Sequence, residues 1–228
     1  VQRVELWFPK NTLIVKEKKS FIARITQMNN EFFTAEINSA GWLSASSNTS
    51  RANSPNFNDR PYGIEPTLVV LHSISLPMGK FGGDNVKNLF LNKLKTSTPE
   101  FKSLSSLKVS SHFFVRRTGR IIQFVSTTKR AWHAGESSFF GAKNCNDFSI
   151  GIELEGSDFV KFEDVQYHSL FFLLGLLSKK FPSLSAITSH EYIAPKRKTD
   201  PGPFFDWEAL EKNLSDLSIS WEIFVSKK

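Results

Sequence analysis

A single cysteine and the absence of long apolar runs set the first limits on this sequence. Cys145 is the one thiol among 228 residues, so neither an internal disulfide nor a cysteine-rich structural zinc site can form. The longest apolar stretch, residues 170–177, is far shorter than the roughly 18 residues that a membrane-spanning helix requires. The amino-terminal residues also lack the apolar core of a secretory signal. We therefore expect a cytoplasmic protein with no membrane partner.

Positive charge is unevenly distributed along the chain. The net charge is +7, and residues 1–27 hold six Lys or Arg against two Glu, which leaves +3 for the rest. No nucleic-acid recognition motif accompanies this charge, so we expect no nucleic-acid partner. A weakly positive body can instead attract substrates that carry carboxylates.

The first 27 residues differ in character from the remainder. The chain opens with Val1, and Met28 precedes the region that carries the motifs described below. Residues 1–27 are either a genuine basic tail or lie upstream of a natural start at Met28, and we favour the start at Met28. With 40% apolar residues the chain can bury a full core. We expect residues 28–228 to form one domain and residues 1–27 to lie outside its fold.

Apolar patterning predicts an α/β (α+β) fold, in which helices pack on a central mixed β-sheet. Strands are expected near residues 68–71, 112–115, 121–125 and 148–154. Thr118 and Gly119 form a turn signal between the second and third of these, which predicts a hairpin.

Three helices and one connecting segment complete the expected organisation. The longest helix should run from 162 to 181, opening near Asp164 and ending before proline. Others should follow Asp84 and Asp206, and the Asp206 carboxylate can cap the first free N–H groups. Residues 44–61 are half Ser and Asn and predict a surface loop or linker.

Residues 188–203 carry three chemically different side chains on a proline-rich segment. His190, Lys198 and Asp200 supply an imidazole, an ammonium and a carboxylate. Prolines restrict the backbone here and so hold side chains in place without further ordering. The alternative interpretation is a basic surface loop followed by the start of a helix. The interpretation as a reactive site is favoured when residues elsewhere in the chain supply partners for these three side chains.

His72 is the first such partner. It follows the apolar run 67–71, which predicts a buried strand that ends at this histidine. A lone histidine there is most simply a polar cap. With His190 and Asp200, however, two imidazoles and one carboxylate match a catalytic zinc site, which keeps a fourth position open. We therefore expect one Zn²⁺ per chain, bound in a cleft at the strand ends.

Glu153 is the second partner. Alternation over residues 148–156 places Ile150 and Ile152 on one face of a strand and Glu153 on the other. A carboxylate in mid-strand is costly to bury without a role. The pattern alone leaves two interpretations equally open: Glu153 faces solvent on an edge strand, or it is a general base that takes a proton from an attacking water.

Several segments of the chain, in the same order, closely resemble the cytoplasmic anhydro-N-acetylmuramoyl-L-alanine amidases. That family belongs to the zinc amidase superfamily that also contains the peptidoglycan recognition proteins. The matching segments are 71–77 (LHSISLP), 81–83 (FGG), 109–112 (VSSH), 116–119 (RRTG), 129–135 (KRAWHAG), 145–156 (CNDFSIGIELEG), 193–195 (IAP) and 197–207 (RKTDPGPFFDW).

The resemblance implies a role for each candidate. His72, His190 and Asp200 fall on the zinc ligands of the family, Glu153 on its catalytic glutamate and Lys198 on its catalytic lysine. The implied reaction is hydrolysis of the amide between the lactyl group of anhydro-N-acetylmuramic acid and L-alanine, in peptidoglycan recycling. Family members also influence β-lactamase induction. We expect anhydro-muropeptides as substrates and a monomeric enzyme.

The expected substrate contacts are less closely matched. They are Ser73, Lys108, Trp132, His133 and Arg197, with His133 expected to line the cleft. The family commonly has Asn where this chain has Ser73, and Arg where it has Lys108. Arginine binds a carboxylate bidentately whereas lysine acts as a point charge, so affinity for the peptide or sugar can differ while the chemistry is retained.

The remaining histidines are assigned other places. His112, at the start of a predicted strand, is expected to support the site rather than to bind metal. His168 lies on a helical pattern and is expected on a helix surface.

Two alternatives to a cytoplasmic amidase follow from the same motifs. One is an exported amidase that acts on the intact cell wall, against which the missing signal sequence argues. The other is a peptidoglycan-binding module without catalysis, against which the presence of Glu153 and Lys198 argues.

Overall fold

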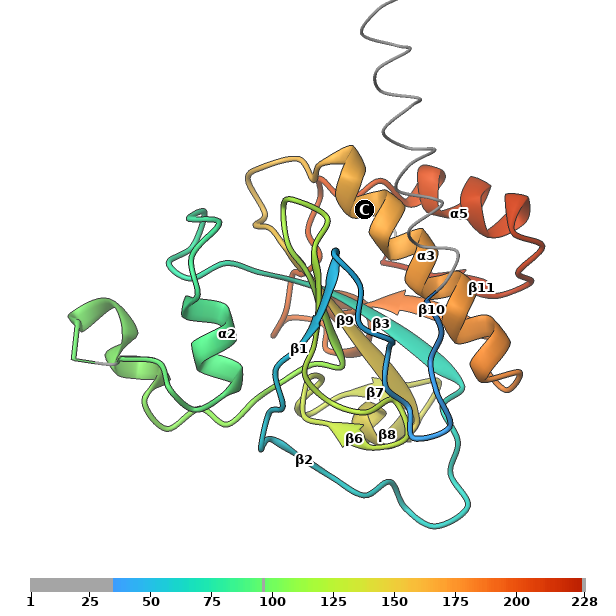
Figure 1. Cartoon of the computed structure of the whole chain (residues 1–228), viewed down its shortest axis with the longest axis horizontal. Coiled ribbons are helices and arrows are strands. Elements are labelled where there is room, and N and C mark those ends of the chain that lie inside the picture. The colour runs from blue at the N-terminus through green and yellow to red at the C-terminus, as the bar shows by residue number, and fades with distance from the viewer. Residues whose placement is uncertain (1–34, 96, 227–228) are drawn as a thin grey trace, which may run out of the picture. The chain divides into compact units, whose positions relative to one another are not determined.

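The computed structural model describes residues 35–95 and 97–226, and the predicted boundary between residues 27 and 28 lies outside this part of the chain. From Glu36 onward the chain forms one unit. Its centre is a seven-stranded mixed sheet in the order β1-β5-β4-β9-β3-β10-β11 (Figure 1). These strands are β1 (Thr49–Arg51), β3 (Leu68–Ile74), β4 (Phe113–Val115), β5 (Ile121–Gln123), β9 (Ser149–Glu155), β10 (Ala186–Ser189) and β11 (Glu222–Phe224).

Five strands of the sheet share one direction, namely β4, β9, β3, β10 and β11, and the neighbouring pair β5 and β1 runs the opposite way. Strand β5 is the antiparallel partner of β4 in a hairpin that turns at Gly119. Gly119 has φ +80, a conformation that favours glycine, and an added Cβ would meet the Val165 side chain at 2.6 Å. The hairpin prediction is confirmed. Strand β3 is buried on both faces over residues 68–72, which accounts for its near-continuous apolar run, and every residue of β9 is buried as well.

Within the described residues, four α-helices accompany the sheet, together with two short 3₁₀ helices (Figure 1). They are α2 (Asn85–Phe90), α3 (Asp164–Lys180), α4 (His190–Ile193) and α5 (Trp207–Asp216), with η1 (Pro99–Leu104) and η2 (Cys145–Asp147). The predicted helices after Asp84 and Asp206 are present, and Asp206 accepts a hydrogen bond from Ala209 N at 2.9 Å as expected of an N-cap. Helix α3 begins with a capping box formed by Glu163 and Gln166.

Two buried apolar clusters lie on one face of the sheet, because Phe114 pairs in register with Glu153 and Glu153 with His72. Phe114 and Ile122 pack with Phe90 of α2 in one buried cluster, while Leu68 and Val70 of β3 belong to a second one. Because side chains alternate along a strand, His72 lies on the same face as Leu68 and Val70. The fold therefore places the candidate metal ligand on the sheet face that also carries the segment from 130 to 148.

Two details of the fold differ from the predictions. Strand β3 runs to Ile74, so His72 lies within it and not at its end. The segment 44–61, expected to be a loop or linker, contains β1 and β2 (Phe57–Asn58). Strand β1 pairs with β5 and forms one edge of the sheet, where the side chain of Thr49 is buried.

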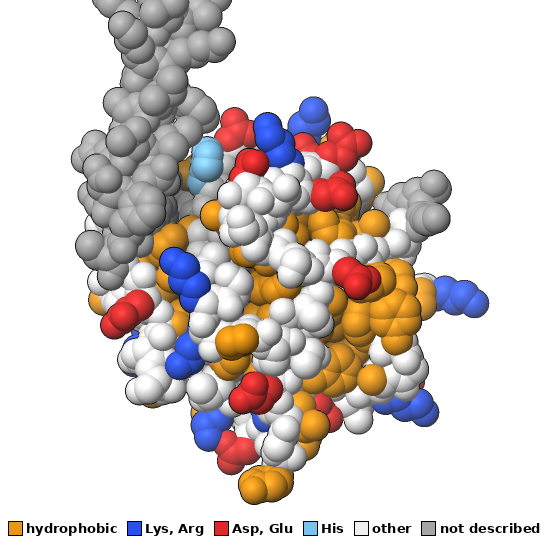
Figure 2. Space-filling model, turned by 90° about the vertical axis from the view of Figure 1, so that its right-hand side faces the viewer, with side chains coloured by type: hydrophobic (Ala, Val, Ile, Leu, Met, Phe, Trp, Pro, Cys, Tyr) orange, Lys and Arg blue, Asp and Glu red, His pale blue; other side chains and the backbone are white. Residues whose placement is uncertain are grey.

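Two short antiparallel pairs lie outside the main sheet. They join β2 with β6 (Arg130–Ala131), and β7 (Ser138–Phe139) with β8 (Ala142–Lys143). In the ranges that the structure describes, no helix has the length and apolar character to cross a membrane. On the face shown in Figure 2, basic and acidic side chains are interspersed around apolar ones and do not form a field of one sign.

Candidate active site

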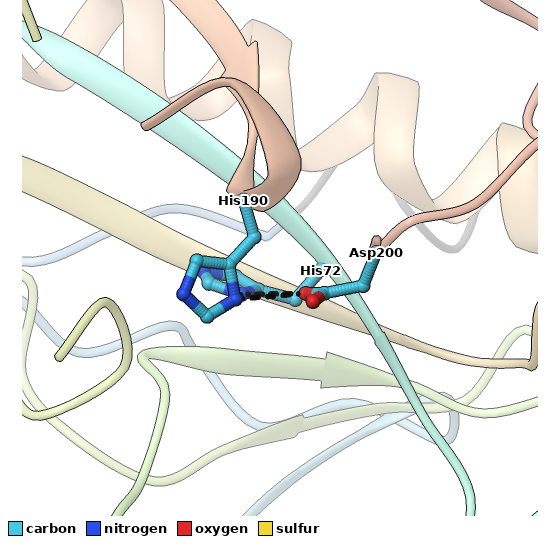
Figure 3. Close-up of side chains that lie close together, drawn as sticks. All are labelled: His72, His190 and Asp200. Atoms are coloured by element: carbon cyan, nitrogen blue, oxygen red, sulfur yellow. Dashed lines mark hydrogen bonds and ion pairs between the residues drawn. The ribbon is translucent and has the colours of Figure 1, made fainter. Parts of the chain in front are cut away.

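Three potential metal ligands from three segments converge on one point (Figure 3). His72 comes from β3, His190 begins α4, and Asp200 lies in the loop that follows α4. The Nδ1 atoms of the two histidines are 2.9 Å apart. Asp200 Oδ2 lies 3.1 Å from His72 Nδ1 and 2.9 Å from His190 Nδ1. Both imidazoles are buried, and the carboxylate is partly exposed.

The backbone around His190 explains why it meets Asp200. Strand β10 lies beside β3, and Ser189 pairs in register with Leu71. Ser189 then caps α4 by accepting a hydrogen bond from Tyr192 N at 3.0 Å. Glu191 N donates to Asp200 O at 3.0 Å, which ties the loop back to the start of the helix.

The protonation states suit metal binding. Burial, reinforced by His190, lowers the pKa of His72 to about 4, so its imidazole is neutral at physiological pH. Burial alone would raise the pKa of Asp200, but hydrogen bonds with His190 and His72 outweigh it and hold that pKa below its usual value. The group therefore offers neutral imidazole nitrogen and ionised carboxylate oxygen, the donor forms that metals bind.

Glu153 lies next to this group and not at an edge of the sheet. Strand β9 runs between β3 and β4, and Glu153 is the Cα partner of His72 on one side and Phe114 on the other. Its side chain is buried, and Oε2 has no hydrogen-bond partner within the described structure. Burial and the charge of Asp200 raise the pKa of Glu153 well above its usual value, while Lys198 opposes the rise. The solvent-facing interpretation of Glu153 is therefore wrong.

A cleft of about 500 Å³ opens beside the group. Its walls include Asp200 and Lys198, so the predicted catalytic lysine borders the same space as a metal ligand. Ser73 and Arg197 also line the cleft. Arg197 Nη2 donates to Ala134 O at 2.7 Å and to Glu136 O at 2.5 Å, which anchors the loop from 194 to 200.

His133 lies behind the ligands, not on the wall of the cleft where it was expected. Its ring is buried and contacts His72 Nε2 through Nδ1 at 2.9 Å. The sequence could not show this position because it arises when the segment 130–148 packs on the face of β3 and β9. His112 lies farther back and supports the sheet, as predicted: its Nδ1 accepts a hydrogen bond from Gly151 N at 3.0 Å.

The other expected residues lie in different places. Lys108 is exposed and is not part of the cleft wall. Trp132 is half-buried and donates from Nε1 to Asn58 Oδ1 at 2.7 Å, also outside that wall. His168 lies partly exposed on α3, as expected.

Several residues that build the site escaped the sequence analysis. Met78 and Phe159 are exposed apolar side chains on the cleft wall. Asp158 also lines it and accepts a hydrogen bond from Thr199 Oγ1 at 2.7 Å. Asn146 Oδ1 accepts from the backbone N–H groups of residues 133 and 134. Only Asn146 carried a signal, since it stands within a matched segment.

Known proteins are similar to this chain in both sequence and fold. Residues 62–203 match the family described as N-acetylmuramoyl-L-alanine amidase. The chain is 46% identical over 169 residues to the 1,6-anhydro-N-acetylmuramyl-L-alanine amidase AmpD of Citrobacter freundii, which covers 73% of this chain and 89% of that protein. It is 47% identical over 158 residues to the AmpD of Haemophilus influenzae, covering 68% and 86%.

A solved structure extends the similarity to the fold. The crystal structure of a selenomethionine derivative of AmpD superposes with a TM-score of 0.73 at 44% identity, covering 76% of this chain and 97% of that one. The resemblance seen in the motifs is thus confirmed over most of the chain. We conclude that the chain belongs to the N-acetylmuramoyl-L-alanine amidase family, and within it to the AmpD type.

Proposed function

We propose that this chain is a zinc-dependent amidase that hydrolyses the bond between the lactyl group of anhydro-N-acetylmuramic acid and L-alanine in muropeptides. One observation carries the proposal. His72, His190 and Asp200 converge at the head of a cleft that Lys198 also lines, and Glu153 stands in register with His72 on the adjacent strand.

The donor set fits zinc. Two imidazole nitrogens and one carboxylate oxygen form the type of ligand set that catalytic zinc sites use, with one position open for water or substrate. Their mutual distances of 2.9 to 3.1 Å approach the roughly 3.3 Å that tetrahedral bonds of 2.0–2.1 Å imply. Both imidazoles are buried, and their nitrogens face the Asp200 carboxylate and each other at close range. A bound cation would account for this arrangement.

Glu153 and Lys198 have different roles in the proposed reaction. Bound zinc would polarise the scissile carbonyl, lower the pKa of the attacking water and favour the ionised form of Glu153. Glu153 accepts the proton of that water as the water adds to the carbonyl carbon, and returns it to the leaving amine of L-alanine. Lys198 faces the same space and stabilises the negative charge that develops on the carbonyl oxygen.

The proposed substrate is inferred from the names of the relatives and from the residues that line the cleft. The AmpD relatives are named 1,6-anhydro-N-acetylmuramyl-L-alanine amidases. The lining of the cleft includes Lys196 and Arg197, which can attract the carboxylates of a stem peptide, and Ser73. We propose these residues as substrate contacts. Lys108 and Trp132 stay predictions that depend on how far the substrate extends beyond the cleft.

The biological setting proposed is peptidoglycan recycling in the cytoplasm by a monomer that binds one zinc ion. A comparison of substrates tests it. Purified protein is incubated with soluble anhydro-muropeptides and, separately, with intact sacculi, and the released peptides are quantified. Cleavage of the soluble substrate with little release from sacculi supports the proposal. Efficient release from sacculi identifies a cell-wall amidase, and binding without release identifies a module that lacks catalysis.

A further inference from the structure

The outer nitrogens of the two histidine ligands have different partners. His190 Nε2 lies 3.0 Å from Ala134 O. A carbonyl can only accept, so His190 carries its proton on Nε2 and turns an unprotonated Nδ1 toward Asp200. His72 Nε2 instead lies 2.9 Å from Nδ1 of another imidazole, His133. That contact alone does not decide which ring donates.

The hydrogen bonds on the other side of the His133 ring decide which of the two rings donates. His133 Nε2 lies 3.2 Å from Ser149 Oγ, and Ser149 Oγ lies 2.5 Å from Cys145 O. The shorter contact ends on a carbonyl, so the hydroxyl proton of Ser149 is donated to Cys145 O. Ser149 Oγ must then accept from His133 Nε2. With its proton on Nε2, His133 has a bare Nδ1, which accepts from His72 Nε2 and leaves His72 Nδ1 free to bind metal.

Burial preserves this series of hydrogen bonds. His133, Ser149 and Cys145 are all buried, so water does not replace a missing partner. A buried donor or acceptor without its partner is costly, which favours the one arrangement in which every donor and acceptor of the series is paired.

The position of the His133 ring is also built into the fold. A Cβ added at Gly151 would lie 2.4 Å from His133 Cγ, so glycine at this point of β9 makes room for the ring. Asn146 Oδ1 accepts from His133 N at 3.0 Å and from Ala134 N at 2.8 Å. Residues 133 and 134 thus supply the partner of Nε2 in each histidine ligand, and the side-chain amide of Asn146 holds both residues in place.

We propose that His133 and Ser149 are positioning residues that hold His72 in the tautomer with its proton on Nε2, so that Nδ1 is presented to the metal. The inference rests on the zinc site of the proposed function. Groups that orient a ligand in this way typically change metal affinity by about 10–100-fold when they are removed.

An isosteric pair of variants tests the proposal. His133→Asn and His133→Leu remove the same ring and leave side chains of similar shape, but only Asn offers an oxygen near the former Nδ1. Zinc affinity of the full chain is measured by competition with a chelator of known affinity. We expect His133→Leu to bind zinc at least about tenfold more weakly than His133→Asn, with Ser149→Ala also weakened. Ser169→Ala, which removes a buried hydroxyl bonded to Gly119 O, is the matched control and should bind like wild type.

A second measurement needs neither zinc nor activity. Nitrogen-15 NMR of the metal-free protein reports which nitrogen of His133 carries the proton. A proton on Nε2 agrees with the proposal, and a proton on Nδ1 overturns it. Equal zinc affinities for His133→Leu, His133→Asn and wild type would also overturn it. Failure of the wild-type protein to bind zinc would instead refute the proposed function, so the two outcomes are distinct.

Discussion

His72 and Glu153 are Cα partners on the adjacent parallel strands β3 and β9. Side chains of paired residues in a sheet point to the same face, so the register alone places the candidate base beside the candidate metal ligand. Because β9 is also paired with β4 on its other side, the position of Glu153 is fixed from both directions. This arrangement keeps a buried carboxylate beside the candidate metal ligands without a flexible loop.

Replacing Glu153 by Gln should separate metal binding from turnover. The amide keeps the size of the side chain but cannot accept the proton of the attacking water. We expect kcat to fall by at least about 10²-fold while zinc content stays at the wild-type level. Metal analysis and steady-state kinetics on the same preparation check this. Turnover close to wild type would place the general base elsewhere.

Lys198→Gln should also spare the metal. Loss of the ammonium removes a charge aimed at the developing oxyanion, which typically costs about 10²–10³ in kcat. Lys196→Gln, an exposed position in the same loop, is the control for a general loss of positive charge and should affect KM more than kcat. If the two variants behave alike, Lys198 serves substrate attraction and not transition-state stabilisation.

His112 makes the stability of the metal-free protein depend on pH. Burial and the Arg60 guanidinium lower its pKa to about 3. Below its ordinary pKa near 6.5 the unfolded imidazole binds a proton that the folded one does not, so stability falls as pH drops from 6.5 toward 3, by about 1.4 kcal/mol per pH unit below about 6. The depressed pKa values of His72 and His133 act in the same direction.

Urea unfolding at pH 7.5 and pH 5.0 measures that dependence. His112→Gln should lower stability at both values because Gly151 N loses its acceptor, yet the difference between the two pH values should shrink. An unchanged difference would show that His112 is not a neutral buried group in the folded state.

Residues 1–27 are the subject of a simpler prediction. They lie outside the segments shared with the family, and the family match begins at residue 62. A chain that starts at Met28 should keep the Tm, zinc content and turnover of the full chain. Thermal melts and kinetics of both forms check this, and a markedly lower Tm for the shorter chain would make these residues part of the fold.

The sequence was most informative where one segment carried its own signal. The apolar run at Leu68 predicted a buried strand, and the capping signal at Asp206 predicted a helix start, because both depend on neighbouring residues. Strands β10 and β11 were missed because they are short and are defined by pairing with distant partners. Strand β1 was hidden in a Ser- and Asn-rich stretch for the same reason.

The residues of the candidate site also divide into those that carry a local signal and those that are defined by distant partners. Histidine and carboxylate chemistry pointed to His72, His190 and Asp200, and the family motifs agreed. The place of His133 behind His72 could not be predicted, since the relation between them is created by sheet packing over 61 residues of sequence. Ser149 stands within a matched segment, but nothing in the sequence indicated its role, because a serine in a strand is chemically ordinary until its partners are known.

The central claim is that zinc held by His72, His190 and Asp200 is required for cleavage of an anhydro-muropeptide amide. The most direct test follows one substrate, an anhydro-N-acetylmuramoyl tripeptide, by mass spectrometry with native protein, with chelator-treated protein and after zinc is restored. We predict release of a peptide with a free L-alanine amino group, its loss on metal removal, and its return with about one zinc per chain. Full cleavage by metal-free protein, or by a His190→Ala variant that binds no zinc, would contradict it.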